Sequence, residues 1–212
     1  MRQRLNQHAP AARQGYTLAC PLTDGRIALL PLLTTPRLEL RSAALEDAAF
    51  FLRLLNEPSW LENIGDRGVR TLADAEGYIR NNIWAPYRSC GFGLYAVQLK
   101  SQPLPIGLCG LVKRDFLCSP DLGFALLPEY CGRGFATEAA RAVLSHAQVE
   151  LRIGRLYAIV RSGNQRSVRL LEQLGFLRAG PYQIPQGDVV ELYQLIAIAP
   201  HGVISESPRA PL

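Results

Sequence analysis

The chain turns from a strand to a helix in the stretch Leu126-Leu-Pro-Glu-Tyr-Cys-Gly-Arg-Gly-Phe-Ala-Thr-Glu-Ala-Ala140. The residues before it, 121–127, read as a strand that stops at Pro128. Gly132 and Gly134 allow backbone conformations that a side chain would forbid, and they allow another molecule to approach closely. The helix that follows directs its unpaired N–H groups and its positive dipole end into this loop. The stretch therefore predicts an anion site, most often one for phosphate.

This loop and a second motif about thirty residues later both resemble motifs of a known family. Tyr130-Cys-Gly-Arg-Gly-Phe-Ala136 resembles the pyrophosphate loop of the GNAT superfamily, the acetyl-CoA-dependent N-acetyltransferases. Asn164-Gln-Arg-Ser-Val-Arg-Leu-Leu-Glu-Gln-Leu-Gly-Phe176 resembles the second motif of that superfamily, an Asn-capped helix that ends in Gly-Phe. Its Asn-x-x-Ser pattern, and the earlier Thr35-Pro-Arg-Leu-Glu-Leu-Arg41, resemble the ribosomal-protein N-terminal acetyltransferases. The likeness extends from about Thr34 to Ile198, with both motifs in the expected order.

Composition describes an ordinary globular protein with a mildly basic surface. The 212 residues are 48% hydrophobic and 19% charged, which excludes a disordered chain and allows one domain with a substantial core. A net charge of +5 favours acidic partners, and the polyanion coenzyme A is one such partner. The arginines are scattered and form no basic stripe, so we predict no nucleic-acid partner.

Cysteine and histidine positions argue against disulfides and metals. The five cysteines are odd in number and show no CxxC spacing, which indicates reduced thiols in a cytoplasmic protein. The three histidines lie far apart and predict no metal site. No apolar run approaches the ~20 residues of a membrane span. The N-terminal apolar stretches are broken by Pro21 and by residues 23–26, so we expect neither a signal peptide nor a membrane partner.

The pattern along the chain predicts a mixed α/β sheet with helices on both faces. Strands are expected over 37–41, 92–99, 105–112, 121–127, 155–160, 177 onward and 189–198. Helices are expected over 45–55, from a cap at Thr71, after Gly134, and from Asn164 to a glycine at Gly175. The turn at 100–103 predicts antiparallel neighbours, whereas the helix after Gly134 predicts a right-handed crossover to a parallel strand. The family resemblance implies the same fold, with the parallel pair splayed at the cofactor cleft.

We expect three regions along the chain. Residues 1–33 form an extension that is partly disordered or carries an added hairpin, with strands over 16–20 and 26–30. Residues 34–198 form the N-acetyltransferase domain, and residues 199–212 form a disordered tail. A monomer or a homodimer fits this organisation.

The resemblance implies where acetyl-CoA binds. The strand before the loop, at Phe124, Ala125 and Leu126, would pair with the pantetheine arm. The pyrophosphate would contact Gly132, Arg133, Gly134, Phe135, Ala136 and Thr137. Asn164 is predicted to cap its helix, and the resemblance implies that it also contacts the pantetheine amide. Arg166 or Arg169 is a further candidate for a phosphate contact, and an exposed helix arginine is the alternative for each.

Acetyl transfer needs a base for the amine and an acid for the leaving thiolate. Asp121 begins the strand that leads to the loop, where relatives often carry a carboxylate that acts through water. Burial beside a groove would raise its pKa towards that of a base, whereas exposure to solvent would leave it an ordinary strand-end carboxylate. Glu129 and Glu191 are reserve candidates. Many relatives donate a proton from a tyrosine in the second motif; Leu171 stands there, and the resemblance implies Ser167 as a coenzyme contact or proton donor.

The acceptor side is identified by resemblance alone. Trp60, Ile64 and Arg67 lie between the first strand and the next hairpin, a segment that lines the acceptor groove in this superfamily, and plain core packing is the alternative for Trp60. The resemblance implies a protein N-terminus as acceptor, with a small amine as the alternative.

Other functions fit the motifs less well. Cys131 at a helix N-terminus suggests a nucleophile, but no His or Asp is placed by sequence to activate it. A dinucleotide site would need a third glycine and an acidic end to the next strand, which ends instead in Arg161. The serious alternative is a coenzyme A-binding sensor that has kept the fold and lost the transfer reaction.

Overall fold

The structure is a computed structural model that describes residues 31–185 and 187–196. The hairpin expected over residues 16–30 and the tail 199–212 lie outside the described residues. The first described strand, β1 (Pro31–Thr34), lies across the boundary expected between residues 33 and 34. It pairs with the next strand, so residues 31–33 already belong to the sheet.

Among the described residues, one sheet of eight strands has the order β1-β2-β3-β4-β5-β6-β8-β7. After β1 the strands are β2 (Leu38–Arg41), β3 (Leu94–Leu99), β4 (Pro105–Val112), β5 (Asp121–Leu126), β6 (Arg155–Arg161), β7 (Leu177–Gln183) and β8 (Val189–Ile196). The pair β5–β6 is parallel and the other neighbours are antiparallel. This confirms the predicted mixed α/β fold with one parallel pair after a crossover helix.

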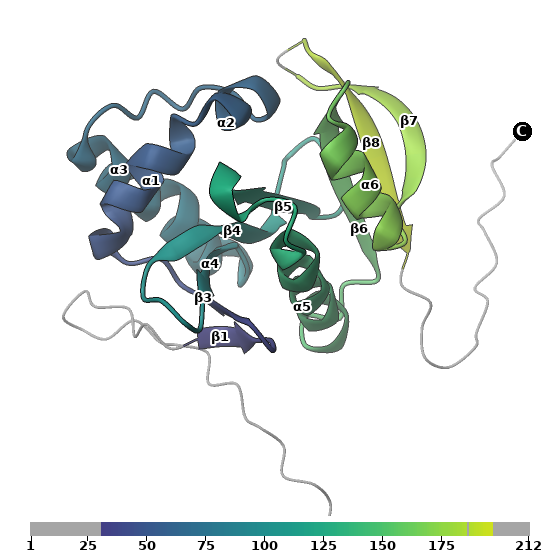
Figure 1. Ribbon diagram of the computed structural model, residues 1–212. Coiled ribbons are helices and arrows are strands. Elements are labelled where there is room, and N and C mark those ends of the chain that lie inside the picture. The colour runs from purple at the N-terminus through teal and green to yellow at the C-terminus, as the bar shows by residue number, and fades with distance from the viewer. Residues whose placement is uncertain (1–30, 186, 197–212) are drawn as a thin grey trace, which may run out of the picture.

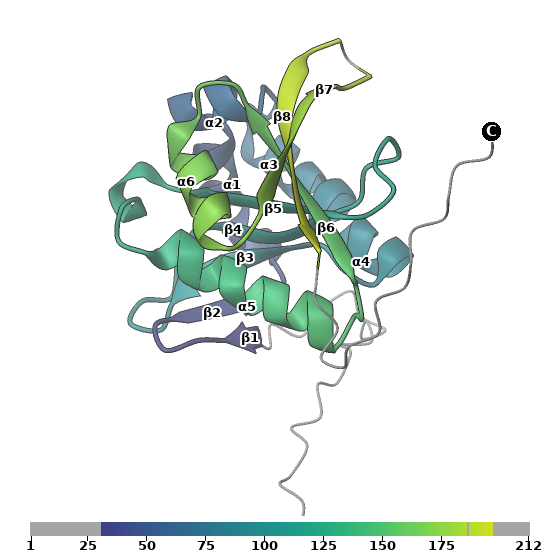
Figure 2. The same cartoon turned by 90° about the vertical axis from the view of Figure 1, so that its right-hand side faces the viewer.

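Helices cover both faces of the sheet (Figure 1). Before β3 come η1 (Leu45–Asp47), α1 (Ala48–Leu55), α2 (Pro58–Asn63), α3 (Leu72–Tyr78), the π-helix η2 (Ile79–Trp84) and α4 (Ala85–Cys90). After β5 come the short 3-10 helix η3 (Pro128–Tyr130), α5 (Phe135–Val149) and, after β6, α6 (Gln165–Gln173). Figure 2 shows α5 and α6 together on one side of the strands, with α5 crossing the β2–β4 half.

Two apolar cores result, one on each face. On one face the small residues Ala139, Ala140 and Ala147 of α5 pack closely on the sheet. On the other face Phe51 of α1 and Ile79 of η2 pack against the sheet, and both side chains are fully buried. The sheet is therefore shielded on both faces along β2 to β5.

Local signals account for most element ends. Thr71 accepts a hydrogen bond from the Asp74 backbone, and the Asp74 carboxylate accepts one from the Thr71 backbone, a capping box that begins α3. Gly175 ends α6 with φ 87°, as expected of a C′ glycine. No helix was predicted after Pro58, yet α2 begins there, because proline is favourable at the first helical position.

Candidate active site

The sheet opens between β5 and β6, close to its middle. Within the described residues one register pair, Asp121 with Tyr157, joins the two strands, and the Tyr157 N–H donates to the Pro120 carbonyl at 2.9 Å. Beyond this point β5 stays paired with β4 through Leu126, while β6 stays paired with β8 through Arg161. The backbone groups of β5 that face β6 after Asp121 therefore have no strand partner, and an extended ligand can pair with them.

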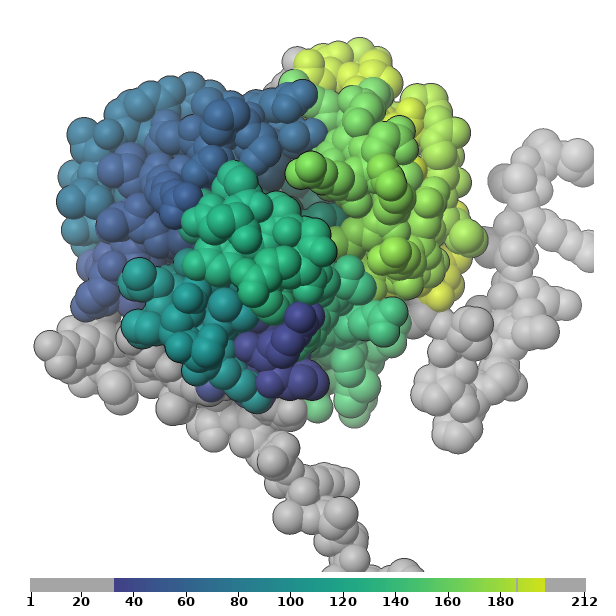
Figure 3. Space-filling view, in the orientation of Figure 1, coloured from purple at the N-terminus to yellow at the C-terminus, as the bar shows by residue number. Residues whose placement is uncertain are grey.

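The surface is hollowed at this fork. Figure 3 shows the hollow between the blue segment of α1 to α3 and the green segment of β6 and α6, beside the teal loop that follows β5. Phe124, Ala125 and Leu126, the three residues expected to meet the pantetheine arm, are each partly exposed on β5. The structure thus brings these residues together at the fork.

A glycine loop follows β5 and begins α5. Gly132 and Gly134 have φ of 73° and 79°, a left-handed conformation that favours glycine. Gly134 is the N-cap of α5 without a side-chain cap, and the first bond to its carbonyl comes from the Glu138 N–H. The N–H groups of Phe135, Ala136 and Thr137 therefore lack an intrahelical acceptor, as in an anion site.

The side chains of this loop differ in what they can offer a ligand. Phe135, the first residue of α5, has a buried side chain, so its backbone N–H is the part of it that can face a ligand. Arg133 is exposed, and its Cζ lies 5.1 Å from the centroid of the Phe135 ring. Arg133 can therefore add positive charge beside the loop, whereas the glycines and first-turn amides provide directed hydrogen bonds.

Helix α6 begins beside the other strand of the fork. Asn164 caps it, with its Oδ1 accepting the Ser167 N–H at 3.1 Å, as predicted. Ser167 lies in the first turn and is partly exposed. Leu171, at the position of the family's tyrosine, is fully buried, and no proton donor stands there.

Asp121 lies where the two strands separate. Its side chain is 2% exposed, and one of its oxygens accepts a hydrogen bond from Arg114 Nε at 2.9 Å. Burial raises the pKa of the Asp121 carboxyl, although the Arg114 guanidinium opposes the shift. Of the two environments that the sequence left open, the structure shows the buried one.

The reserve carboxylates are less suited to accept a proton. Glu129 is exposed and paired with Arg53, and hydrogen bonds from its own backbone and from Arg53 lower its pKa despite some desolvation. Glu191 accepts a hydrogen bond from Arg178 at 2.7 Å. Desolvation raises the pKa of the Cys131 thiol, which lies 3.6 Å from the Leu127 carbonyl, so this cysteine is a weak nucleophile.

The predicted acceptor residues separate into core and surface. Trp60 is 5% exposed and packs in the core with α1, and its Nε1 has no hydrogen-bond partner among the described residues. Ile64, at the end of α2, is 38% exposed, and Arg67 is exposed in the loop between α2 and α3. Ile64 and Arg67 can therefore meet another molecule directly, whereas Trp60 supports the segment from within.

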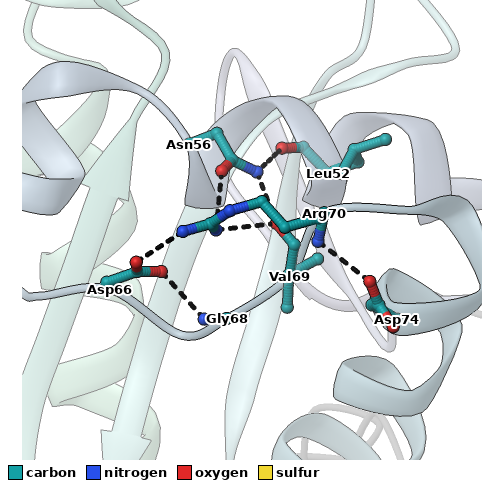
Figure 4. Close-up of polar contacts among 7 residues, drawn as sticks. All are labelled: Leu52, Asn56, Asp66, Gly68, Val69, Arg70 and Asp74. Carbon is teal, nitrogen blue, oxygen red and sulfur yellow. Dashed lines mark hydrogen bonds and ion pairs between the residues drawn. The ribbon is translucent and has the colours of Figure 1, made fainter.

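The loop between α2 and α3 is held by a network that sequence reasoning did not find (Figure 4). Arg70 donates to Asn56 Oδ1 at 3.0 Å and forms an ion pair with Asp66, and the Asp66 carboxylate accepts the Gly68 N–H. Asn56 Nδ2 donates to the Val69 carbonyl at 2.9 Å. These contacts tie the loop that carries Arg67 to the end of α1, although each residue alone is an ordinary surface polar residue.

The described residues contain no group of His, Cys, Asp and Glu arranged to hold a metal ion. In the same part of the chain, no helix is long and apolar enough to cross a membrane.

Comparison with known proteins agrees with this geometry. The acetyltransferase (GNAT) domain family matches residues 37–177. Uncharacterized N-acetyltransferase YnaD of Bacillus subtilis (strain 168) is 25% identical over 158 residues, which cover 74% of this chain and 89% of YnaD.

Two solved structures share the fold over most of their length. An acetyltransferase from Agrobacterium tumefaciens str. C58 is 25% identical with a TM-score of 0.66, covering 78% of this chain and 94% of its own. RimL, a ribosomal L7/L12 alpha-N-protein acetyltransferase solved with coenzyme A, is 19% identical with a TM-score of 0.65, covering 76% and 95%. The family match spans most of the chain, and the fork and the glycine loop lie within it. This protein belongs to the GNAT acetyltransferase family.

Proposed function

We propose that the protein transfers an acetyl group from acetyl-CoA to a primary amine, most readily the α-amine of a protein N-terminus. The observation that carries the proposal is the position of the fork beside the glycine loop. Unpaired β5 backbone and unpaired α5 amides follow one another along the chain from Asp121 to Thr137. One ligand that has an amide-containing arm and a diphosphate would use both.

The donor is held by backbone more than by side chains. Phe124 to Leu126 would pair with the pantetheine amides, as a neighbouring strand would. The amides from Gly132 to Thr137, with the Thr137 hydroxyl, would bind the diphosphate at the positive end of α5. Asn164 already uses its Oδ1 as a helix cap, so a contact with the coenzyme falls to its amide nitrogen.

The chemistry is a direct attack in a ternary complex. The amine nitrogen forms a bond to the thioester carbonyl carbon, the carbon–sulfur bond breaks, and the amine loses a proton. Asp121 is the base, receiving that proton through water, because burial has raised its pKa towards the working range. Ser167 contacts the coenzyme or returns a proton to the departing thiolate, since Leu171 can do neither.

The loop between α2 and α3 supports a protein acceptor. Exposed Ile64 and Arg67 sit on a segment that the Asn56–Asp66–Arg70 network holds in place. Such a preformed surface suits a peptide whose first residues must be oriented, because a held loop loses little entropy on binding. The motifs shared with ribosomal-protein acetyltransferases, and the RimL structure in particular, support the same choice.

Multiple-turnover release of coenzyme A thiol tests this function. Peptides with a free α-amine, the same peptides with that amine blocked, and small-molecule amines would each be supplied with acetyl-CoA. We expect turnover with free peptides and none with blocked ones. Turnover with small amines alone would refute the protein acceptor, and tight acetyl-CoA binding without any release would indicate a sensor.

A further inference from the structure

The turn between β1 and β2 reaches the coenzyme loop, although the proposed function gives it no part. Arg37 lies in this turn, within the Thr35-Pro-Arg-Leu motif, and contacts residues some 96 positions later in the chain. Its side chain is 48% exposed, so burial alone does not explain its fixed position.

Arg37 packs against the loop through its whole guanidinium group. Its Nη1 donates to the Arg133 carbonyl oxygen at 3.1 Å, and its Cζ lies 4.4 Å from the centroid of the Phe135 ring. A Cβ atom added at Gly134 would lie 3.4 Å from Nη2. One arginine therefore contacts Arg133 and Phe135 and lies beside Gly134, the residue between them.

The bond to Arg133 orients a peptide group. In a planar trans peptide the carbonyl and the following N–H point in opposite directions. Because Arg37 draws the Arg133 carbonyl towards the β1–β2 turn, the Gly134 N–H is turned away from that turn. Gly134, in its left-handed conformation, is the N-cap of α5, so the free amides of the first turn follow it directly.

Arg37 also holds the one acidic side chain in the first turn of α5. The Glu138 carboxylate accepts hydrogen bonds from Arg37 Nε at 2.6 Å, from the Arg37 backbone at 2.9 Å and from Thr35 Oγ1 at 2.6 Å. Burial opposes the charged form, but these three bonds lower the pKa of Glu138, which stays ionised at neutral pH. A free carboxylate here would compete with a bound anion for the helix N-terminus.

We propose that Arg37 is a positioning residue for the coenzyme diphosphate: it orients the Arg133–Gly134 peptide and neutralises Glu138. This inference rests on the proposed coenzyme site. Loss of the arginine should weaken acetyl-CoA binding about tenfold, the size expected of one charge-assisted hydrogen bond. Binding of S-acetyl-pantetheine, which has the thioester arm and no phosphate, should not change.

Titration of purified variants with both ligands, followed by nuclear magnetic resonance, measures these affinities. Arg37→Ala removes both roles, whereas Arg37→Lys keeps the charge beside Glu138 and should recover part of the affinity. In Arg37→Ala/Glu138→Gln the unpaired charge is gone, so this variant should bind acetyl-CoA more tightly than Arg37→Ala. Arg80→Ala is the matched control, because Arg80 is also 48% exposed and pairs with a single glutamate, Glu76, four residues earlier. Both residues lie in the helical run of α3 and η2, on the face of the sheet opposite α5.

The outcomes distinguish a wrong role for Arg37 from a wrong coenzyme site. Wild-type protein that binds acetyl-CoA no better than S-acetyl-pantetheine would refute the coenzyme site itself. If the wild type prefers acetyl-CoA and Arg37→Ala keeps that preference, or loses affinity for both ligands equally, the positioning role is wrong. A double variant no better than Arg37→Ala would overturn the neutralising role of Arg37 towards Glu138.

Discussion

Asp121 is the residue on which the proposed chemistry depends most. A base must be deprotonated to act, so a carboxyl with a raised pKa makes the rate rise with pH over a range above that of an ordinary aspartate. Asp121→Asn should lower the rate by about 100-fold or more and remove this rise. The pH profile of turnover at saturating acetyl-CoA is the measurement.

Asp115→Asn is the control for that profile, because Asp115 is exposed in the same β4–β5 loop. It should leave both rate and profile unchanged. A profile unaltered in Asp121→Asn would exclude Asp121 and direct attention to Glu191, since the lowered pKa of Glu129 already makes it the poorer base.

A substitution at Gly134 tests whether the glycine loop binds the diphosphate. An aspartate at Gly134 would place a carboxylate beside the expected diphosphate, and aspartate tolerates the left-handed backbone better than most residues do. Gly134→Asp should therefore fold and fail to bind acetyl-CoA in a calorimetric titration. Gly91→Asp, with φ 76° and ψ 2° at the end of α4, places the same residue in the same backbone conformation outside the coenzyme loop and should bind normally. Retained affinity in Gly134→Asp would contradict the placement of the loop.

At the scale of elements, two glycines should respond oppositely to alanine. A Cβ on Gly110 of β4 would lie 2.2 Å from the Gly93 carbonyl oxygen and 2.7 Å from the Leu94 Cα, both backbone atoms. Gly110→Ala must push β3 and β4 apart and should lower the free energy of unfolding by about 1–3 kcal/mol. Gly77→Ala, in α3 with no atom within 4 Å of the new Cβ, should raise it by about 0.5–1 kcal/mol.

Urea unfolding of both variants measures these changes. Equal effects of the two substitutions would show that β3 and β4 do not approach each other as closely as the structure has them.

Elements with local signals were predictable from the sequence. The glycine loop and the Asn164 cap each depend on neighbours a few residues apart, and their elements appear where expected. Pro58 carried an ambiguous signal, because proline both ends one helix and begins another. The π-helix after α3 has no sequence signal that we recognise, and the helical run continues through it into α4.

Contacts between distant segments were not predictable in the same way. Arg37 and Glu138, or Asn56 and Arg70, are unremarkable polar residues until the fold brings them together. The burial of Asp121 likewise depends on the β4–β5 loop and on β6, which no local pattern describes. The motifs therefore predicted where a candidate site would lie, whereas the ion pairs and burial of its side chains could be described only from the structure.

At the scale of the whole molecule, the fork divides the sheet into two parts. Strands β1 to β5 carry α1 to α4 on one face and α5 on the other, and β6 to β8 carry α6 (Figures 1 and 2). Beyond the single ladder pair, the two parts share one apolar core, to which Leu122, Val143 and Leu156 all belong. A ligand that pairs with β5 inside the fork would fill the gap between them, so donor binding should also stabilise the fold.

The central claim is that the fork and the glycine loop together form an acetyl-CoA site. Calorimetric titration of the purified protein with acetyl-CoA, with free ATP as the control, tests it most directly. ATP carries phosphates without a pantetheine arm, so the account predicts that acetyl-CoA binds at least about tenfold more tightly. Equal binding of the two ligands, or no binding of acetyl-CoA, would contradict the claim.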